Sequence, residues 1–454
     1  MKTDPAHLPV AIIGAGPVGL AAAAHLIERG EQPLVLESGP SIGHSVRKWG
    51  HVRMFSPWHY NIDSASRRLL EAFGWDEPCG ERLPTGRELV GEYLEPLASI
   101  KTVADSLRLS HRVIFVTRDG IDKVRSHNRA AHPFVLRTVD SAGHIVTHRA
   151  KAVIDASGTW DSPNPMGADG LPVPGEELCS SRIDYGIPDM TGPREADFAG
   201  ADVLVVGSGH SSFNAVLNLL HLKEKQPDTM ITWAMRKTKL GNVFGGGTAD
   251  ALPERGELGQ KVREAVDCGA VKLLNPMTIE ELTQNDSNSS ISVHAKVAGD
   301  SVILSVDRVV VATGFRPDLS FSREIRLRLD SALECAGKLG PLIDPNEHSC
   351  GSVPPHGAAE LAHPEPGYYI VGMKSYGRAP TFLLATGYQQ VRSVVAEIAG
   401  DHEAAAKVHL DLPETGVCHL SEEGKSVSPC CGDQSKDAES SPVPDGGTST
   451  FCCG

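Results

Sequence analysis

Two glycine-rich turns, each between a short apolar run and a long helical stretch, constrain the fold of this chain more than any other feature. The first turn is Gly14-x-Gly16-x-x-Gly19, which follows the apolar run 10–13 and opens an Ala/Leu-rich stretch with helical periodicity. Glu37 closes the next apolar run, 23 residues after Gly14. A strand, a glycine turn, a helix and a second strand in this order predict a βαβ unit of a parallel sheet.

The same residues predict a dinucleotide site at this turn. Glycines allow the backbone to approach a diphosphate closely, and the N-terminus of the following helix attracts its negative charge. An acid at the end of the second strand, here Glu37, binds ribose hydroxyls. Because the turn, the helix and the acid are in register, we expect this site to hold an adenine dinucleotide.

A second unit begins with Gly207-x-Gly209-x-x-Ser212, in which serine replaces the third glycine. That position serves helix-to-strand packing, where a small side chain fits. The strand after the helix ends in Arg236 and Lys237 instead of an acid. An arginine binds a 2′-phosphate that an acid would repel, so this unit favours NADPH over NADH. The alternative is that the two cations mark only a solvated strand end.

One unit ends in an acid and the other in two bases. This difference predicts one dinucleotide that stays bound to the protein and one that is exchanged in each reaction cycle. We therefore expect FAD at the first site and NADPH at the second, 193 residues further along the chain. The alternative is a duplicated NAD-binding protein without flavin. Alternation of polar and apolar residues predicts an antiparallel meander after each unit, over 107–157 and within 290–318.

The predicted fold is α/β, with two Rossmann-like dinucleotide-binding domains, antiparallel meanders, and the NADPH domain inserted in the FAD domain. Residues 411–454 carry eight acids, two lysines and many Ser, Gly and Pro, which is typical of a disordered arm. The expected parts are an FAD-binding domain in two pieces, 1–165 and 306–400, an NADPH-binding domain, 200–305, and an acidic flexible tail with cysteine pairs, 405–454.

The composition of the 454 residues excludes several other classes of protein. With 43 basic and 57 acidic residues the net charge is −14, which argues against general nucleic-acid binding. No apolar run approaches the ~18 residues of a membrane helix, and the first residues lack the pattern of a secretory signal. We therefore expect a cytoplasmic protein whose ten cysteines are reduced thiols.

Five motifs together resemble the two-dinucleotide-domain flavoproteins, and among them the flavin-containing monooxygenase-like FAD/NADPH oxidoreductases associated with arsenic-resistance clusters. The motifs are GAGPVG at 14–19, ESGPSIGHSVRKW at 37–49, VIDASGTW at 153–160, GSGHSS at 207–212 and VVATGFRPD at 310–318. The resemblance spans the folded part of the chain, to about residue 400. It implies the fold and both cofactors, and it is much less specific for the reaction.

The resemblance also implies roles for individual residues. Those implied at FAD are Gly14, Gly16, Pro17 and Gly19 at the diphosphate, Glu37 at the ribose, His44, Trp49 and Ser56 near the flavin, and Ala156 to Gly158 as the chain crossing beside it. Those implied at NADPH are Gly207, Gly209, His210, Ser211, Ser212 and, at the 2′-phosphate, Arg236. Thr381 lies in RAPTF at 378–382, which should open the last helix, whose N-terminal dipole can stabilise reduced flavin. Ser56 and Asn61 are the candidate catalytic residues of the folded part, while Trp49 also fits an ordinary core aromatic.

The chain departs from the usual pattern of these monooxygenases between the two domains, where they carry F-x-G-x-x-x-H-x-x-x-[YFW]. Here Gly175 is kept, but Val173 replaces the aromatic residue and Cys179 stands at the histidine position. The chain also departs from flavin disulfide reductases, because no cysteine before Cys430 forms a C-x-x-C or C-x-x-x-x-C pair. Those enzymes tend to have Gly-Asp after the penultimate strand, where this chain has Gly-Met at 372–373.

Two pairs of adjacent cysteines, Cys430-Cys431 and Cys452-Cys453, each occur as CCG in the tail. Adjacent cysteines make a strained, easily reduced disulfide, but two neighbouring thiolates chelate thiophilic ions well. All four are candidate metal ligands, and Cys452 and Cys453 are also candidate catalytic thiols of a redox tail. A flexible arm of this length reaches roughly 40 Å, enough to approach a flavin. A third interpretation is a dispensable extension with incidental thiols.

We therefore expect an FAD-dependent, NADPH-using oxidoreductase, and first a flavin monooxygenase that oxygenates a soft nucleophile or metalloid compound in arsenic or metal detoxification. The alternative enzyme is an NADPH-dependent reductase of a thiophilic metal, a metalloid or a disulfide that uses the C-terminal cysteine pairs. The non-enzymatic alternative is a metal-sequestering protein on a vestigial flavoprotein scaffold. The expected partners are a small-molecule substrate, O2, and a thiophilic metal or metalloid at the tail, with no nucleic acid and no membrane, and a homodimer is left open.

Overall fold

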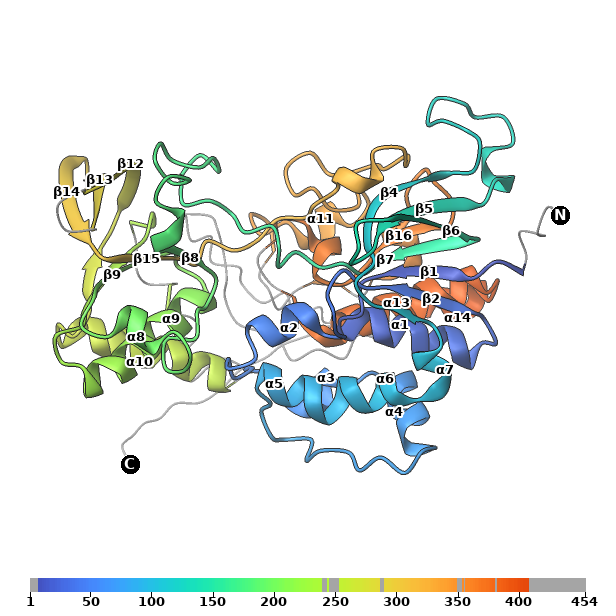
Figure 1. The fold of residues 1–454 in the computed structure, drawn as a ribbon, viewed down its shortest axis with the longest axis horizontal. Coiled ribbons are helices and arrows are strands. Elements are labelled where there is room, and N and C mark those ends of the chain that lie inside the picture. Colours follow the sequence, from blue (N-terminus) through green and yellow to red (C-terminus); the bar gives the residue numbers. More distant parts are fainter. Residues whose placement is uncertain are drawn as a thin grey trace, which may run out of the picture. The chain divides into compact units, whose positions relative to one another are not determined.

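The computed structural model describes residues 7–238, 243–244, 253–285, 290–348, 353–354, 356–379 and 382–407. Over these ranges the chain forms two parallel five-stranded sheets and two antiparallel three-stranded sheets (Figure 1). The predicted α/β class is therefore confirmed. The predicted tail begins at 405, so nearly all of it lies outside the described residues.

The first parallel sheet has the strand order β16-β7-β1-β2-β3. Its strands are β1 (Val10–Ile13), β2 (Pro33–Leu36), β3 (Leu107–Arg108), β7 (Ala152–Asp155) and β16 (Tyr368–Ile370). All four residues of the central strand β1 are buried, as expected for a strand that is covered on both faces. β7 and β16, which are far apart in the chain, are neighbours in this sheet, so the C-terminal part of the chain completes it.

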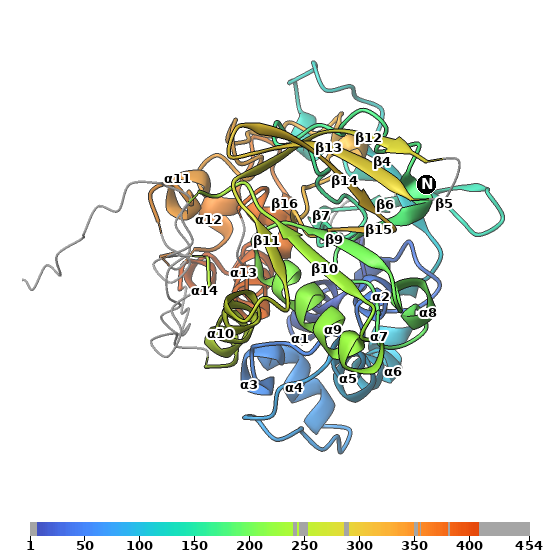
Figure 2. The same cartoon turned by 90° about the vertical axis from the view of Figure 1, so that its left-hand side faces the viewer.

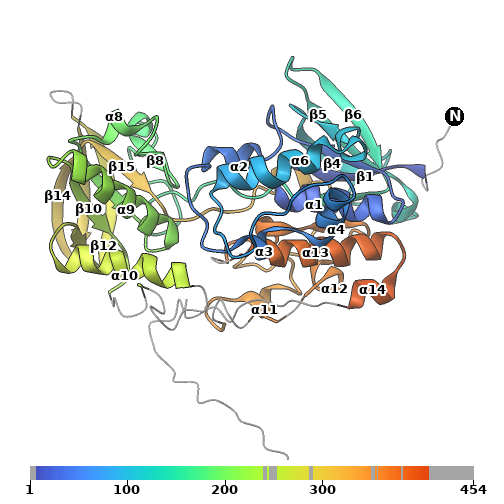
Figure 3. The same ribbon diagram turned by 90° about the horizontal axis from the view of Figure 1, so that it is seen from below.

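Successive residues of β1 face two different cores. Ile12 belongs to the core formed with α1 (Pro17–Glu28) and α13 (Leu384–Ile398), and Ile13 belongs to the core on the opposite face. Ala21 to Ala24 of α1 have no exposed surface. Such small side chains allow the close packing of α1 and α13, which lie side by side in Figure 3.

Shorter helices cover the remaining apolar surface of this part. They are α2 (His44–Lys48), α3 (Trp58–Asn61), α4 (Ser64–Glu71), α5 (Gly86–Glu88), α6 (Glu95–Ser99), α7 (Lys101–Ala104), α11 (Gly340–Ile343), α12 (Ala358–Leu361) and α14 (His402–Ala406). Thr85 and Glu88 form a reciprocal capping box at α5, which satisfies two backbone N–H groups at its start. Among the described helices, none has the length and apolar character needed to cross a membrane.

An antiparallel meander covers the second face of the first sheet. It consists of β4 (Arg112–Arg118), β5 (Phe134–Val139) and β6 (Ile145–Ala150). Phe134 and Leu136 of β5 are buried in one core with Ile13 of β1. The meander predicted over 107–157 is confirmed in its middle, but the strands at its two ends, β3 and β7, pair in the parallel sheet instead.

The second parallel sheet has the order β11-β10-β9-β15-β8. Its strands are β8 (Ile183–Tyr185), β9 (Asp202–Val206), β10 (Met230–Ala234), β11 (Lys272–Leu274) and β15 (Arg308–Val311), with α8 (Glu195–Phe198) before β9. β8 and β15 extend this sheet on both sides of the range 200–305 predicted for the NADPH domain. β9 pairs with β10 on one side, and its backbone groups on the other side also require hydrogen-bond partners. β15 supplies these partners, and β15 in turn pairs with β8.

Helices and a meander cover the two faces of the second sheet, as Figure 2 shows. α9 (His210–Lys225) and α10 (Pro253–Asp267) share one core with Val203 and Val205 of β9. The second meander shares the opposite core with Leu204 of the same strand. It consists of β12 (Met277–Gln284), β13 (Ile291–Val297) and β14 (Asp300–Val306), as predicted within 290–318 except that it starts earlier.

The chain enters and leaves the second sheet along two linkers that lie side by side. The backbone nitrogen of Asn164 donates to the carbonyl oxygen of Gly314 at 2.9 Å, and Pro163 and Phe315 form an isolated antiparallel bridge. The ring of Trp160 stacks on that of Phe315, with 5.1 Å between the ring centroids. The segments that follow VIDASGTW and lie within VVATGFRPD therefore form one short two-stranded connection.

Candidate active site and cofactor sites

The first glycine turn lies at the carboxyl ends of β1 and β7. Gly14 has φ +101°, and a Cβ atom there would lie 2.8 Å from the carbonyl oxygen of Ala156. A Cβ atom on Gly19 would lie 2.0 Å from the carbonyl oxygen of Gly14. Both contacts are too short for any side chain, so the turn and the predicted chain crossing at Ala156 to Gly158 pack directly against each other.

Gly16 lies at the open N-terminus of α1. A Cβ atom on this residue would meet nothing within 4 Å, and no side chain caps the helix here. Pro17 takes the first helical position, where a backbone N–H has no partner in the helix. The helix N-terminus is thus open to an anion, and this bare cradle fits the diphosphate of FAD.

Glu37 follows β2 and braces the same turn. One carboxylate oxygen accepts a hydrogen bond from the backbone nitrogen of Ala15 at 2.7 Å, and the other accepts from the backbone nitrogen of Gly39 at 2.7 Å. Glu37 is 7% exposed. A carboxylate has further lone pairs for ribose hydroxyls, so the predicted ribose contact is compatible with this bracing role, which sequence reasoning missed.

His44 and Trp49 stand at the two ends of α2, and both rings pack on glycines. A Cβ atom on Gly39 would lie 2.3 Å from Cγ of His44, and one on Gly86 would lie 2.7 Å from Cε3 of Trp49. Trp49 is partly buried against the core of the first sheet. Each ring therefore has a packing role, and their place near the flavin stays a prediction.

Ser56, just before α3, and Asn61, the last residue of α3, are bonded to each other. The Ser56 hydroxyl donates to Oδ1 of Asn61 at 3.0 Å, and Nδ2 of Asn61 donates to the carbonyl oxygen of Ser56 at 2.7 Å. The hydroxyl of Tyr388 donates to the carbonyl oxygen of Asn61 at 2.8 Å. Asn61 has no exposed surface, so these bonds hold the loop before α3, and a catalytic role for the two residues stays a prediction.

The second glycine turn repeats this geometry at the carboxyl ends of β9 and β15. Gly207 has φ +136°, and a Cβ atom there would lie 2.3 Å from the carbonyl oxygen of Ala312. A Cβ atom on Gly209 would meet nothing within 4 Å. The hydroxyl of buried Ser212 donates to the carbonyl oxygen of Gly209 at 2.6 Å. The serine that replaces the third glycine therefore braces the turn.

His210 and Ser211 are the first two residues of α9, directly after the turn. The imidazole ring of His210 lies 5.5 Å, between centroids, from the ring of Phe55, which precedes α3. It also lies 5.9 Å, between centroids, from the ring of Phe213. A residue of the predicted FAD domain thus contacts the predicted NADPH turn.

Arg236 follows β10 on the same edge of the second sheet and is exposed. Its Nη1 donates to the carbonyl oxygen of Ala168 at 2.7 Å, which ties the guanidinium to the linker before β8. The remaining donors of the fork suit a phosphate, so the position is compatible with the predicted 2′-phosphate contact.

The segment between the domains is built around Glu176. Its buried carboxylate accepts hydrogen bonds from the backbone nitrogen of Val173 at 2.9 Å and from the hydroxyl of Tyr185 at 2.5 Å. Gly175 has φ +82°, and a Cβ atom there would lie 1.8 Å from the carbonyl oxygen of Leu282, so this glycine is kept for packing. Cys179 is buried, and burial raises the pKa of its thiol.

Residues 11–338 match the family model for pyridine nucleotide-disulphide oxidoreductase. The chain belongs to this family. FAD and NADP(H) are typical of the family and of its structural neighbours, so the two predicted cofactors and the predicted oxidoreductase activity are confirmed. The resemblance is confirmed at the level of a two-dinucleotide-domain flavoprotein oxidoreductase.

Curated relatives of this family member are reductases by name. A ferredoxin–NADP reductase of Nocardioides sp. is 26% identical over 321 residues, which are 70% of this chain and 77% of the relative. Bacilliredoxin reductase Bdr of Bacillus subtilis is 25% identical over 322 residues, 70% of this chain and 80% of the relative.

Solved structures that share the fold include both reductases and monooxygenases. Bacillithiol disulfide reductase Bdr of Bacillus cereus has a TM-score of 0.65 and 21% identity, and the match covers 87% of this chain and 99% of that chain. The cadaverine monooxygenase DfoA of Erwinia amylovora, bound to FAD, has a TM-score of 0.61 and 12% identity, covering 92% and 99%. At these identities the likeness establishes the fold and leaves the reaction open.

Several predicted residues of this oxidoreductase fall outside the described part of the chain. They are Thr381 and the tail cysteines Cys430, Cys431, Cys452 and Cys453. The helix predicted to open at RAPTF is α13, which begins at Leu384 and is followed by α14. Within the described ranges, no group of three or more His, Cys, Asp or Glu side chains is arranged to hold a metal ion.

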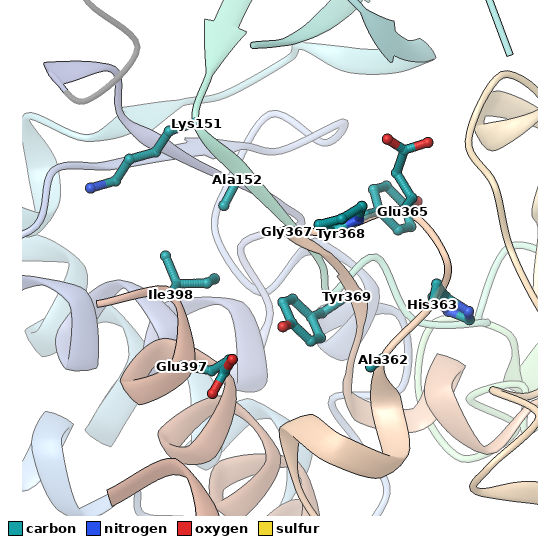
Figure 4. Close-up of a pocket in the computed structure, with 11 residues that line it drawn as sticks. Lys151, Ala152, Ala362, His363, Glu365, Gly367, Tyr368, Tyr369, Glu397 and Ile398 are labelled. Carbon is teal, nitrogen blue, oxygen red and sulfur yellow. The ribbon is translucent and has the colours of Figure 1, made fainter. Parts of the chain in front are cut away.

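A pocket of about 430 Å³ lies at the opposite edge of the first sheet, at the amino ends of β7 and β16 (Figure 4). Its charged lining residues are already paired within the chain. Lys151 contacts Glu31 at 2.5 Å, and Glu397 contacts His402 at 2.8 Å. The first glycine turn lies at the carboxyl end of β7, so this pocket is separate from the predicted FAD site.

Proposed function

We propose that this oxidoreductase is a flavin monooxygenase that uses NADPH and O2 to oxygenate a soft nucleophile or a metalloid compound. The observation that carries the proposal is the placement of the four free cysteines in the described part of the chain. Cys79 and Cys268 are exposed on separate segments, and Cys179 and Cys335 are buried in separate cores. Because these four thiols are separate from one another, none of them forms a pair that a reduced flavin could reduce. This favours a diffusible electron acceptor, such as O2, over a dithiol within the described part of the chain.

Bound FAD supplies two-electron redox chemistry, accepting hydride from NADPH and passing electrons to O2. In the balanced reaction, NADPH, a proton, O2 and the substrate give NADP⁺, water and a product with one added oxygen atom. The protein binds and orients the reactants. The turn Gly14–Gly19 with Glu37 would hold FAD, and the turn Gly207–Ser212 with Arg236 would hold NADPH.

A second candidate is an NADPH-dependent reductase of a thiophilic metal, a metalloid or a disulfide. The position of Cys179 favours this reading, because it stands where the resembled monooxygenases carry a histidine. The names of the curated relatives, ferredoxin–NADP reductase and bacilliredoxin reductase, support it as well. In this reaction the tail pairs Cys430-Cys431 and Cys452-Cys453 bind the soft substrate or relay electrons to it. Either reaction serves arsenic or metal detoxification.

The two candidates differ in their need for O2. The test follows NADPH oxidation by the purified full chain with and without O2, each with arsenite, with Hg²⁺ or with neither. The same measurements are made on a variant with all four tail cysteines changed to serine. The monooxygenase requires O2 in every condition and keeps its NADPH oxidation in the serine variant.

Metal-dependent NADPH oxidation that persists without O2 and is lost in the serine variant contradicts the monooxygenase and supports the reductase. A purified protein that is colourless and takes up no added FAD contradicts both. Incorporation of ¹⁸O from labelled O2 into the product, followed by mass spectrometry, identifies oxygen transfer directly.

A further inference from the structure

A fully buried ion pair joins the ends of two neighbouring strands at the cofactor edge of the first sheet. Nζ of Lys374 lies 2.7 Å from Oδ2 of Asp155, and neither side chain has exposed surface. Asp155 ends β7, and Lys374 lies in the short helical turn Gly372–Tyr376 that follows β16. The pair therefore ties together two turns that leave the sheet side by side.

The ion pair also fixes the hydroxyl of Ser157. This hydroxyl donates to Oδ1 of Asp155 at 2.6 Å and accepts a hydrogen bond from Nζ of Lys374 at 3.0 Å. Its only proton and one of its two lone pairs are thereby used. Ser157 itself is exposed, so the remaining lone pair of a rigidly held hydroxyl is available to a hydrogen-bond donor from outside the chain.

Both turns touch the FAD turn. A Cβ atom on Gly14 would lie 3.1 Å from Cα of Ser157, and one on Gly372 would lie 3.3 Å from Val18 in the first turn of α1. In the sheet order, β7 lies on one side of β1 and β2, which leads to Glu37, lies on the other. A dinucleotide with its adenosine ribose at Glu37 and its diphosphate at the turn would therefore have its other sugar chain on the side of Ser157.

A buried ion pair is weak evidence that it stabilises the fold. Removing two charges from water is costly, and well-packed apolar residues in place of a buried pair are often neutral or stabilising. A buried pair at the cofactor edge, bonded to an exposed hydroxyl, is better explained by the ligand. We propose that Lys374 and Asp155 are positioning residues of the FAD site, which hold Ser157 so that its hydroxyl accepts a hydrogen bond from the ribityl chain. The proposal rests on FAD use by the family and not on the choice between oxygenation and reduction.

The test compares the binding of FAD and of ADP, which lacks the ribityl chain. Deflavinated full-length protein is titrated with FAD by flavin fluorescence, and ADP is titrated as a competitor. Three variants are used: Ser157→Ala, the double variant Lys374→Met with Asp155→Leu, and the control Tyr368→Phe, which removes a buried hydroxyl that contacts Asp155 at 3.4 Å and also bonds Ser322 but does not contact Ser157. The melting temperature of each apoprotein shows whether it folds.

Ser157→Ala should raise the Kd for FAD about three- to tenfold, the usual range for one hydrogen bond, and leave ADP competition unchanged. The double variant should raise the Kd for FAD at least as much with little change in apoprotein melting, and Tyr368→Phe should bind FAD like the wild type. Wild-type FAD affinity in Ser157→Ala overturns the proposal, and so does equal weakening of FAD and ADP. If the double variant does not fold, the Ser157→Ala result alone decides.

Discussion

The carboxylate of Glu37 lies 2.7 Å from the backbone nitrogen of Ala15, the residue between the first two glycines of the FAD turn. The acid that the sequence motif assigns to the ribose is therefore also part of the scaffold that shapes the diphosphate cradle. The turn geometry and the predicted ribose contact therefore involve the same side chain.

Replacing Glu37 should separate these two effects. Glu37→Gln keeps one oxygen acceptor but loses the charge, and a hydrogen bond to a charged group contributes about 1.5–3 kcal/mol. We expect Glu37→Gln to raise the Kd for FAD at least about tenfold and to lower apoprotein melting less than Glu37→Ala does, because only one of the two backbone N–H groups loses its acceptor. Glu37→Ala should lower apoprotein melting as well, because the Ala15 and Gly39 N–H groups lose their partner. Flavin fluorescence titration and thermal melting measure both, and unchanged FAD affinity in Glu37→Gln would contradict the role.

Alanine at the two open glycines should affect ligands but not folding. Gly16 and Gly209 have φ −80° and −98°, and a Cβ atom on either would meet nothing within 4 Å. We expect Gly16→Ala to weaken FAD and Gly209→Ala to weaken NADPH, each about tenfold or more, because the methyl group enters the path of the diphosphate. Gly19→Ala is the contrast, since it should prevent normal folding of the turn. Binding titrations beside apoprotein melting check this, and a cross-effect, with FAD weakened by Gly209→Ala, would argue against separate sites.

Arg236 should set the preference between the two pyridine nucleotides. Loss of a charge-assisted bond to the 2′-phosphate costs about 1.5–3 kcal/mol, so Arg236→Ala should raise KM for NADPH about tenfold or more. KM for NADH, which lacks this phosphate, should not change. Arg263→Ala, on an exposed helix face, serves as the control for lost positive charge. Steady-state kinetics with both nucleotides measure the ratio, and an equal rise for NADH would place Arg236 away from the 2′-phosphate.

His363 should make the fold sensitive to mild acid. It is 8% exposed, and its Nε2 has no hydrogen-bond partner among the described residues. Burial lowers the pKa of His363 to about 4, whereas a histidine in the unfolded chain has a pKa of about 6.5. The unfolded state therefore binds the proton first as pH falls. The contribution of neutral His363 to the free energy of unfolding is therefore complete above about pH 6.5. Roughly 2–3 kcal/mol of this contribution is lost by about pH 4.

His363→Asn removes this titration while keeping an acceptor for the backbone nitrogen of Arg328, which donates to Nδ1 at 3.3 Å. We expect the variant to lose less unfolding free energy than the wild type between about pH 7 and pH 4.5. Denaturant unfolding at the two pH values gives the difference. His127→Asn, at an exposed histidine, should behave like the wild type. The same pH dependence in His363→Asn and in the wild type would assign the effect to other groups.

Much of the fold follows from local patterns. The strand 10–13, the glycine turn and the helix after it appear where the sequence predicts them, because periodicity and turn chemistry act over neighbouring residues. The membership of β8 and β15 in the second sheet could not be predicted in this way. Strand pairing depends on contacts between residues that are far apart in the sequence. The residues of these short strands do not indicate which sheet they join.

The site was predictable where a motif describes it and not where distant residues meet. The glycines, Glu37 and Arg236 belong to motifs, but Lys374 and Asp155 are 219 residues apart and meet only in the fold. A single lysine after an apolar strand usually reaches solvent, so nothing marks Lys374 as buried except the apolar run around it. Ser56 and Asn61 show the reverse case. The sequence marked them as candidate catalytic residues, but in the structure their polar side chains are bonded to each other.

The side-by-side linkers at Asn164 and Gly314 have a consequence for how such a chain can arise and be rebuilt. The backbones of Asn164 and Gly314, where the chain enters and leaves the second sheet, are joined by one hydrogen bond. The polypeptide between them, called the cassette below, therefore has its two ends side by side. Domain insertion succeeds where the ends of the inserted piece lie close together at a surface. A short turn joining 163 to 315 should therefore close the remaining chain without stretching it, and the excised cassette could be exchanged for one with another nucleotide preference.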